Sequence, residues 1–135
     1  MLILPASLVE MMIFHARQVY PDEACGLIGG TDAEGRILRP IRNVADAPTM
    51  RFRMDPEEQI RALAAIEARG CGLIGIYHSH PTGPPRPSDT DIVEAQYPEA
   101  FYLIVSLADL ARPSVTVWLI RDGHARPALW QVKEG

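Results

Sequence analysis

Residues 72–91 read GLIGIYHSHPTGPPRPSDTD, and this stretch decides how the chain is expected to fold. Its first residues, Gly72–Tyr77, are almost all apolar, which is typical of a strand buried on both faces of a sheet. The segment Pro81–Pro87 has four prolines in seven residues, which favour a stiff extended loop over a helix or a central strand. Ser88–Asp91 then has the S-x-x-D spacing with which helices begin. A buried strand, a stiff loop and a helix are therefore predicted in succession.

The segments on either side alternate between helical and extended patterns. Residues 6–19 predict a helix with His15 beside an apolar face, which consists of Leu8, Met11, Met12 and Val19. A second helix is predicted to open at Asp55-Pro56-Glu57-Glu58 and to end at Gly70, with an apolar face of Ile60, Leu63 and Ile66. Further strands are predicted at Ala24–Gly30, Ile37–Ile41, Arg51–Met54, Phe101–Leu107, Val115–Ile120 and Ala128–Val132. The last of these would return after a hairpin at Asp122-Gly123, and the whole pattern predicts an α/β fold with a central sheet.

Composition excludes several classes of protein. Hydrophobic residues make up 47% and charged residues 22% of the 135 residues, so disordered and fibrous chains are excluded and one domain, residues 1–135, is expected. The 13 basic and 17 acidic residues give a formal net charge of −4, which disfavours non-specific binding to nucleic acid. Pro5, Ser7 and Glu10 interrupt the first apolar stretch, so neither a signal peptide nor a membrane span is predicted. We expect a soluble cytoplasmic protein.

The segment that follows the buried strand carries metal-ligand chemistry. His78 and His80, two positions apart on a strand, point to the same face and could hold one ion. The proline-rich loop then returns the chain, with Asp91 after ten intervening residues. Two histidines and a carboxylate leave the fourth tetrahedral position of a zinc ion for water, as in hydrolytic sites. The alternative is structural: two hydrogen-bonded core histidines, and an aspartate that serves only to cap a helix.

The pattern H-S-H-P-x6-S-x2-D resembles the signature of the JAMM (MPN+) metallopeptidases. Asp22–Leu27 resembles the segment that carries the catalytic glutamate of this family, and Asn43, Phe52 and Met54–Pro56 fall where such domains have similar residues. The glutamate–cysteine–glycine run most resembles a compact bacterial branch related to the sulfur-carrier-protein cysteine peptidase. The similarity runs from the first helix to the strand near Val105. It implies an MPN/JAB-type, cytidine deaminase-like fold with a mixed central β-sheet flanked by helices.

The resemblance also implies a role for each site residue. His78, His80 and Asp91 match the ligands of one zinc ion per chain. Glu23 matches the general acid/base that activates the zinc-bound water, and Ser88 matches the hydroxyl that helps to stabilise the tetrahedral oxyanion. Taken alone, Glu23 would be a surface acid at a turn and Ser88 a helix cap, although capping and catalysis are compatible roles for one serine. The presence of all five residues argues against the metal-free scaffold members of the superfamily.

The implied function is hydrolysis of the bond after the C-terminal Gly-Gly of a ubiquitin-like or sulfur-carrier protein. The carrier, the amine that is released (free cysteine or a lysine side chain) and the oligomeric state, with a homodimer among the options, stay open. No nucleic-acid or membrane partner is expected. One alternative is a non-catalytic MPN-type interaction domain. Another is a RadC-like DNA-associated protein, although that branch tends to have asparagine where Ser79 stands, and a nucleoside deaminase would need a P-C-x-x-C motif.

Four further residues have no firm role in the sequence. Cys25 and Cys71 lie in apolar, glycine-rich segments and are predicted to be small buried hydrophobic residues rather than nucleophiles. Arg51 and Arg53 would share one face of a strand, either facing solvent or meeting an acidic partner.

Overall fold

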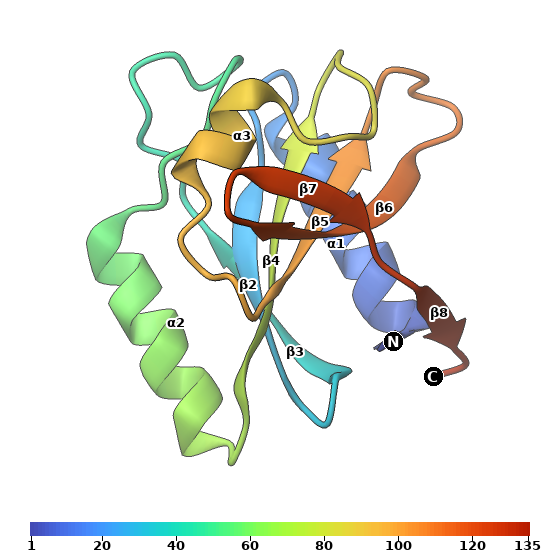
Figure 1. The fold of residues 1–135 in the computed structure, drawn as a ribbon. Coiled ribbons are helices and arrows are strands. Elements are labelled where there is room, and N and C mark those ends of the chain that lie inside the picture. Colours follow the sequence, from blue (N-terminus) through green and yellow to red (C-terminus); the bar gives the residue numbers. More distant parts are fainter.

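Eight strands form one mixed sheet in the computed structural model, which describes residues 1–135 (Figure 1). In chain order the elements are β1 (Leu2–Pro5), α1 (Ala6–Val19), β2 (Cys25–Thr31), β3 (Glu34–Ile41), α2 (Pro56–Ala68), β4 (Gly72–His80), α3 (Asp89–Glu94), β5 (Phe101–Ser106), β6 (Ser114–Arg121), β7 (His124–Pro127) and β8 (Trp130–Lys133). Across the sheet the order is β7-β6-β5-β4-β2-β3-β1-β8. The strand β4 lies antiparallel to β2 and parallel to β5, so the predicted apolar strand is central.

The two long helices cover opposite faces of the sheet. Leu8, Met12 and Ala16 of α1 join one core cluster, and Ala62 and Ile66 of α2 join the other. Because strand residues alternate between faces, Tyr77 of β4 packs in the α1 cluster and its neighbour Ile76 in the α2 cluster. The histidines of β4 share the face of Ile76, which is the α2 face.

The predicted helical faces were wrong at two positions. Met11 is 51% exposed and Ile60 is 68% exposed. The stripe of α1 that touches the sheet repeats every four residues, from Leu8 through Met12 to Ala16, and Met11 lies about 100° of helical rotation away from its centre. On α2, Ala62 and Ile66 face the sheet instead, and Ile60 turns toward solvent.

The predicted strand at Arg51–Met54 is instead part of the loop between β3 and α2. Residues 43–54, the 43–54 loop, contain one isolated bridge between Asn43 and Met54. The Asn43 side chain supplies the bonds that a strand ladder would have made: its Oδ1 accepts from the amides of Ala45 and Arg53, and its Nδ2 donates to the carbonyls of Glu23, Pro48 and Arg51. One amide side chain therefore organises the loop.

The C-terminal prediction was correct for the hairpin and wrong for the strand that follows. Asp122 and Gly123 have φ values of 53° and 74°, and β7 pairs with β6 beyond them. Pro127, which has no N–H, is the last residue of β7. The chain then crosses to the far edge of the sheet, where β8 pairs in parallel with β1.

The segments that carry the site gather at one end of the sheet. The C-terminal end of β4, the loop Pro81–Pro87 (the proline loop), α3 and the 43–54 loop lie together at the top of Figure 1. Asp55 caps α2 by accepting hydrogen bonds from the amides of Glu57 and Glu58, as its sequence predicts. None of the helices is both long enough and apolar enough to cross a membrane.

The glycines of β2 leave no room for a Cβ, and Gly26 gives a test of the packing. Gly26 lies opposite Tyr77, and a Cβ at Gly26 would overlap the buried tyrosine ring, whose hydroxyl bonds His15 Nδ1 at 2.7 Å. We expect Gly26→Ala to lower the free energy of unfolding by about 1–3 kcal/mol in urea titrations. Gly72→Ala is the control, because no atom lies within 4 Å of its added Cβ. Equal unfolding midpoints for the two variants would contradict the packing described.

Candidate active site

The strand β4 places two histidines side by side. His78 lies opposite Cys25 of β2 and Ile104 of β5, and His80 lies opposite Ser106 of β5. Only 2% of His78 and 7% of His80 is exposed. The Nε2 atoms of the two rings are 3.1 Å apart. The i, i+2 spacing on a strand therefore brings both rings to one face of the sheet, as the sequence predicts.

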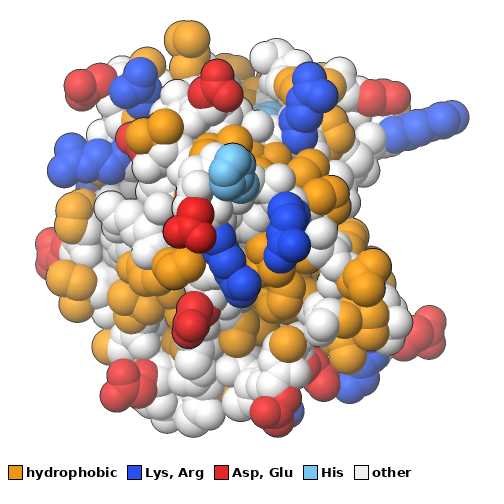
Figure 2. All heavy atoms as spheres, viewed as in Figure 1, with side chains coloured by type: hydrophobic (Ala, Val, Ile, Leu, Met, Phe, Trp, Pro, Cys, Tyr) orange, Lys and Arg blue, Asp and Glu red, His pale blue; other side chains and the backbone are white.

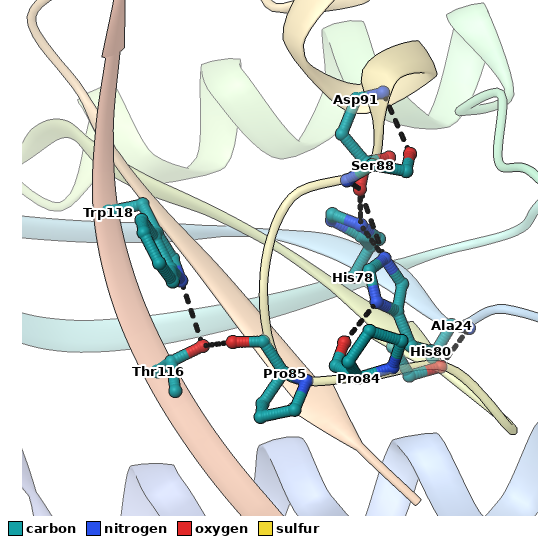
Figure 3. Close-up of polar contacts among 10 residues, drawn as sticks. Ala24, His78, His80, Pro84, Pro85, Ser88, Asp91, Thr116 and Trp118 are labelled. Atoms are coloured by element: carbon teal, nitrogen blue, oxygen red, sulfur yellow. Dashed lines mark hydrogen bonds and ion pairs between the residues drawn. The ribbon is translucent and has the colours of Figure 1, made fainter. Parts of the chain in front are cut away.

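The first turn of α3 brings Asp91 to the histidines. Ser88 is the N-cap: its Oγ accepts from the Asp91 amide at 3.1 Å, and its own amide donates to Asp91 Oδ2 at 2.9 Å. This reciprocal capping box fixes the carboxylate. The same Oδ2 lies 3.1 Å from His78 Nε2 and 3.0 Å from His80 Nε2 (Figure 3). Asp91 is thus both a helix-capping residue and a member of the histidine cluster.

The three atoms fit a single metal ion. Their separations of 3.0–3.1 Å approach the roughly 3.3 Å between corners of a tetrahedron with 2.0 Å bonds. Burial opposes ionisation of Asp91, but hydrogen bonds from His78 and His80 hold the pKa of its carboxyl well below its ordinary range. Burial also lowers the pKa of His80, yet the hydrogen bonds to Asp91 and Pro84 outweigh burial and raise it overall. Burial lowers the pKa of His78, which favours its neutral, metal-binding form. The ionised Asp91 gives the cluster a negative charge that a cation would balance.

The proline loop determines which nitrogen of His80 faces the cluster. His80 Nδ1 lies 2.8 Å from the carbonyl oxygen of Pro84, an atom that can only accept a hydrogen bond. Nδ1 therefore keeps its proton, and Nε2 is the nitrogen that can bind a metal once it gives up the proton it shares with Asp91. His78 is held differently: the Phe52 ring stacks on it with centroids 4.6 Å apart, and its buried Nδ1 has no hydrogen-bond partner.

Glu23 lies just before β2 and is 5% exposed. Its amide donates to the Pro48 carbonyl at 2.7 Å, and its carbonyl accepts from Asn43 Nδ2 at 3.1 Å, so the 43–54 loop holds its backbone. Burial raises the pKa of its carboxyl, His80 opposes the rise and the Asp91 charge adds to it, and the net result is a pKa of about 7. Its Oε1 is buried with no partner. A carboxyl with this pKa can accept and return a proton near neutral pH.

One cavity is shared by both predicted catalytic residues and one of the predicted ligands. Glu23, His80 and Ser88 line a hollow of about 460 Å³, walled by Thr49 and Met50 of the 43–54 loop and by the proline loop. Glu23 and Ser88, 65 positions apart in the chain, are therefore accessible to one bound molecule.

Sequence reasoning missed the strand residues that hold the proline loop. Ser106 Oγ donates to the Gly83 carbonyl and Thr116 Oγ1 donates to the Pro85 carbonyl, each at 2.7 Å. Trp118 Nε1 in turn donates to Thr116 Oγ1 at 2.9 Å (Figure 3). The only signal in the sequence was that Ser106 and Thr116 are polar residues in otherwise apolar strands. Nothing in the sequence indicates that they contact the proline loop.

The remaining candidates lie outside the cluster. Burial raises the pKa of the Cys25 thiol to about 12, and the thiol donates to the Ile41 carbonyl, so this cysteine is not a nucleophile. Cys71 was predicted to be buried and is half-buried instead, because it lies in the turn after α2. Arg51 and Arg53 are exposed on the 43–54 loop.

The fold and this donor set define a metallopeptidase domain of the JAB type. A family described as prokaryotic homologues of the JAB domain matches residues 5–121. The chain belongs to this family and is a JAMM-type metallopeptidase, which confirms the resemblance in the sequence.

Two relatives have names that describe enzymes. The CysO-cysteine peptidase of Mycobacterium tuberculosis is 38% identical over 124 residues, which cover 90% of this chain and 84% of the relative. The desampylase of Haloferax volcanii is 39% identical over 110 residues, covering 76% of this chain and 78% of the relative.

Solved structures agree with the fold. A protein from Desulfitobacterium hafniense, known from its solution structure, superposes with a TM-score of 0.90 at 36% identity, covering 100% of this chain and 94% of that one. A JAB1/MPN domain protein from Archaeoglobus fulgidus shares the fold with a TM-score of 0.62 at 20% identity, covering 98% of this chain and 97% of that one. The predicted MPN/JAB-type mixed sheet flanked by helices is confirmed.

Proposed function

We propose that this protein is a zinc-dependent peptidase or isopeptidase that hydrolyses the bond after the C-terminal Gly-Gly of a ubiquitin-like or sulfur-carrier protein. The observation that carries the proposal is the convergence of His78, His80 and Asp91, with separations of 3.0–3.1 Å, beside a cavity that His80 and Glu23 both line. The relative named CysO-cysteine peptidase supports a carrier–amine bond as the substrate.

His78, His80 and Asp91 would hold one zinc ion. Zinc, when bound, supplies an activated water for hydrolysis by lowering its pKa to about 7. Glu23 accepts the proton of the attacking water and later delivers it to the leaving amine. Its unpaired Oε1 and its pKa of about 7 suit both transfers.

Ser88 would stabilise the negative charge that develops on the scissile carbonyl oxygen. Its Oγ accepts from the Asp91 amide, which leaves its own proton free to donate. The hydroxyl borders the same cavity as Glu23 and His80. One hydroxyl would therefore cap α3 and contact the substrate.

A Gly-Gly tail suits the approach to the site. Phe52 stacks on His78, and no backbone hydrogen bond within the chain engages Phe52, so its N–H and carbonyl could pair with an extended peptide. Phe52 also borders a second hollow of about 490 Å³, with Leu27, Ile76 and Tyr102 among its apolar lining residues. We infer that the carrier's tail enters from this hollow and passes Phe52 with its two glycines, which need no side-chain room.

The surface charges and the two free cysteines indicate the kind of partner and the cellular compartment of the protein. On the face that Figure 2 shows, acidic and basic side chains are interspersed with apolar ones, which suits a protein partner better than nucleic acid. Both cysteines are free, as is usual for proteins of reducing compartments. We place the enzyme in the cytoplasm.

Cleavage of defined fusions tests this proposal. Carrier proteins from the same genome that end in Gly-Gly would be joined to free cysteine or, through a lysine side chain, to a peptide. They would then be incubated with the zinc-loaded enzyme and read by intact mass. We expect cleavage after the second glycine, and loss of cleavage when both glycines are replaced by valine. Cleavage elsewhere, or equal cleavage of the valine variant, would contradict the assigned substrate class.

We expect Ser88→Ala to lower kcat by about 10²–10³-fold with a smaller change in KM, because the proposed hydrogen bond strengthens in the transition state. Loss of the cap alone would cost only about 1 kcal/mol of stability. Steady-state kinetics at matched zinc occupancy measure the first effect and thermal unfolding measures the second. A variant that melts several degrees lower yet turns over normally while folded would restrict Ser88 to capping.

A further inference from the structure

The proline loop cannot fix its own shape through amide donors. Pro81, Pro84, Pro85 and Pro87 have no N–H, and within the loop only the Arg86 amide bonds a loop carbonyl, that of Pro84 at 2.8 Å. The loop is held instead through three successive carbonyls, each accepting from a side chain of the sheet. These are Gly83 from Ser106, Pro84 from His80 and Pro85 from Thr116.

The acceptor and donor groups around the Thr116 hydroxyl determine which way its hydrogen bonds run. A carbonyl can only accept, so the Thr116 hydroxyl proton points at Pro85, and the indole N–H of Trp118 can only donate, so it occupies a lone pair of Thr116 Oγ1. Trp118 therefore donates to Thr116, and Thr116 donates to the Pro85 carbonyl. Figure 3 shows this chain ending one residue from the carbonyl that meets His80 Nδ1.

The sheet register explains why β6 can reach the loop. His78 of β4, Ile104 of β5 and Thr116 of β6 lie directly opposite one another, and Ile76, Tyr102 and Trp118 form the next row. Directly opposed residues share a face of the sheet, so Thr116 and Trp118 lie on the same face as the two histidines.

We propose that Thr116 and Trp118 are positioning residues for the metal site. By fixing Pro85 they keep the Pro84 carbonyl against His80 Nδ1, which holds the ring orientation and the tautomer that present Nε2 to the ion. This inference rests on the proposed function, because it assumes that His80 binds zinc. Groups that orient a ligand histidine typically change metal affinity by about 10–100-fold when removed, and the less direct contact of Thr116 places it at the lower end.

Zinc affinity of three variants tests the inference. Thr116→Val keeps the side-chain shape and removes the hydroxyl, and Thr116→Ser keeps the hydroxyl. Trp118→Phe removes the indole N–H together with the five-membered ring and keeps an aromatic side chain. Competition with a chromophoric chelator gives the zinc Kd, and thermal unfolding of the metal-free proteins gives their stability. We expect Thr116→Val to raise the Kd about tenfold, Trp118→Phe to raise it less, and Thr116→Ser to bind like wild type.

The outcomes separate this inference from the proposed function. A purely structural role would lower the melting temperature of Thr116→Val and leave its zinc Kd unchanged, which would overturn the inference alone. Equal weakening in Thr116→Ser and Thr116→Val would also overturn it, because the hydroxyl would then be irrelevant. A wild-type protein that binds no zinc would overturn the inference and the proposed function together.

Discussion

Replacing Glu23 with glutamine should leave the fold and the bound zinc intact and lower kcat by about 10²–10⁴-fold, the usual contribution of a positioned general acid or base. The amide matches the carboxyl in shape but cannot take a proton from water. Burial already raises the pKa of this carboxyl to about 7, so a neutral amide at this position costs little stability. Fusion cleavage, zinc content and thermal unfolding would be measured on the same preparation.

The neighbouring acid provides a matched control for Glu23. Asp22→Asn makes the same chemical change one residue earlier, at a partly exposed side chain that does not line the 460 Å³ cavity. We expect it to cleave like wild type. If Glu23→Gln cleaved at a near-normal rate, the proton acceptor would have to lie elsewhere.

Alanine at His78, His80 or Asp91 should abolish stoichiometric zinc and, with it, cleavage. An open site with three protein ligands keeps only two after such a change, too few to hold the ion. Metal analysis after gel filtration would measure the loss. Asp91→Ala should also melt earlier than the histidine variants, because it alone removes a bond of the capping box.

His124→Ala is the control for the ligand variants, since this histidine is exposed at the start of β7. It should retain one zinc per chain. Stoichiometric zinc in His80→Ala would remove the ligand assignment.

The sequence predicted most of the fold because local signals were strong. The apolar run before His78, the N-cap of α2, the capping box of α3 and the Asp122-Gly123 hairpin are each recognisable within a few residues. The wrong predictions fell where contacts between residues far apart in the sequence determine the structure. Arg51–Met54 alternates like a strand, but the Asn43 side chain bonds the Arg51 carbonyl and the Arg53 amide. Similarly, β8 finds its partner in β1, which no local pattern near Trp130 could indicate.

The site was predictable to the extent that it lies in one continuous motif. His78, His80, Ser88 and Asp91 fall within residues 78–91, and strand and capping geometry alone bring them together. Glu23 could be predicted only from the family resemblance, since its place beside the cluster depends on the pairing of β2 with β4. The contacts of Thr116 depend on strand register across β4, β5 and β6, which residue spacing does not encode.

Titration of the metal-free protein with zinc, with cleavage of the carrier fusion followed at each addition, tests the central claim most directly. We expect no cleavage without zinc, a linear rise in rate up to one equivalent per chain, and a plateau beyond it, because one His–His–Asp site holds the ion. His80→Ala under the same titration should stay inactive. Full cleavage by the metal-free protein, or equal activation of His80→Ala, would contradict the assignment of a zinc peptidase site to these residues.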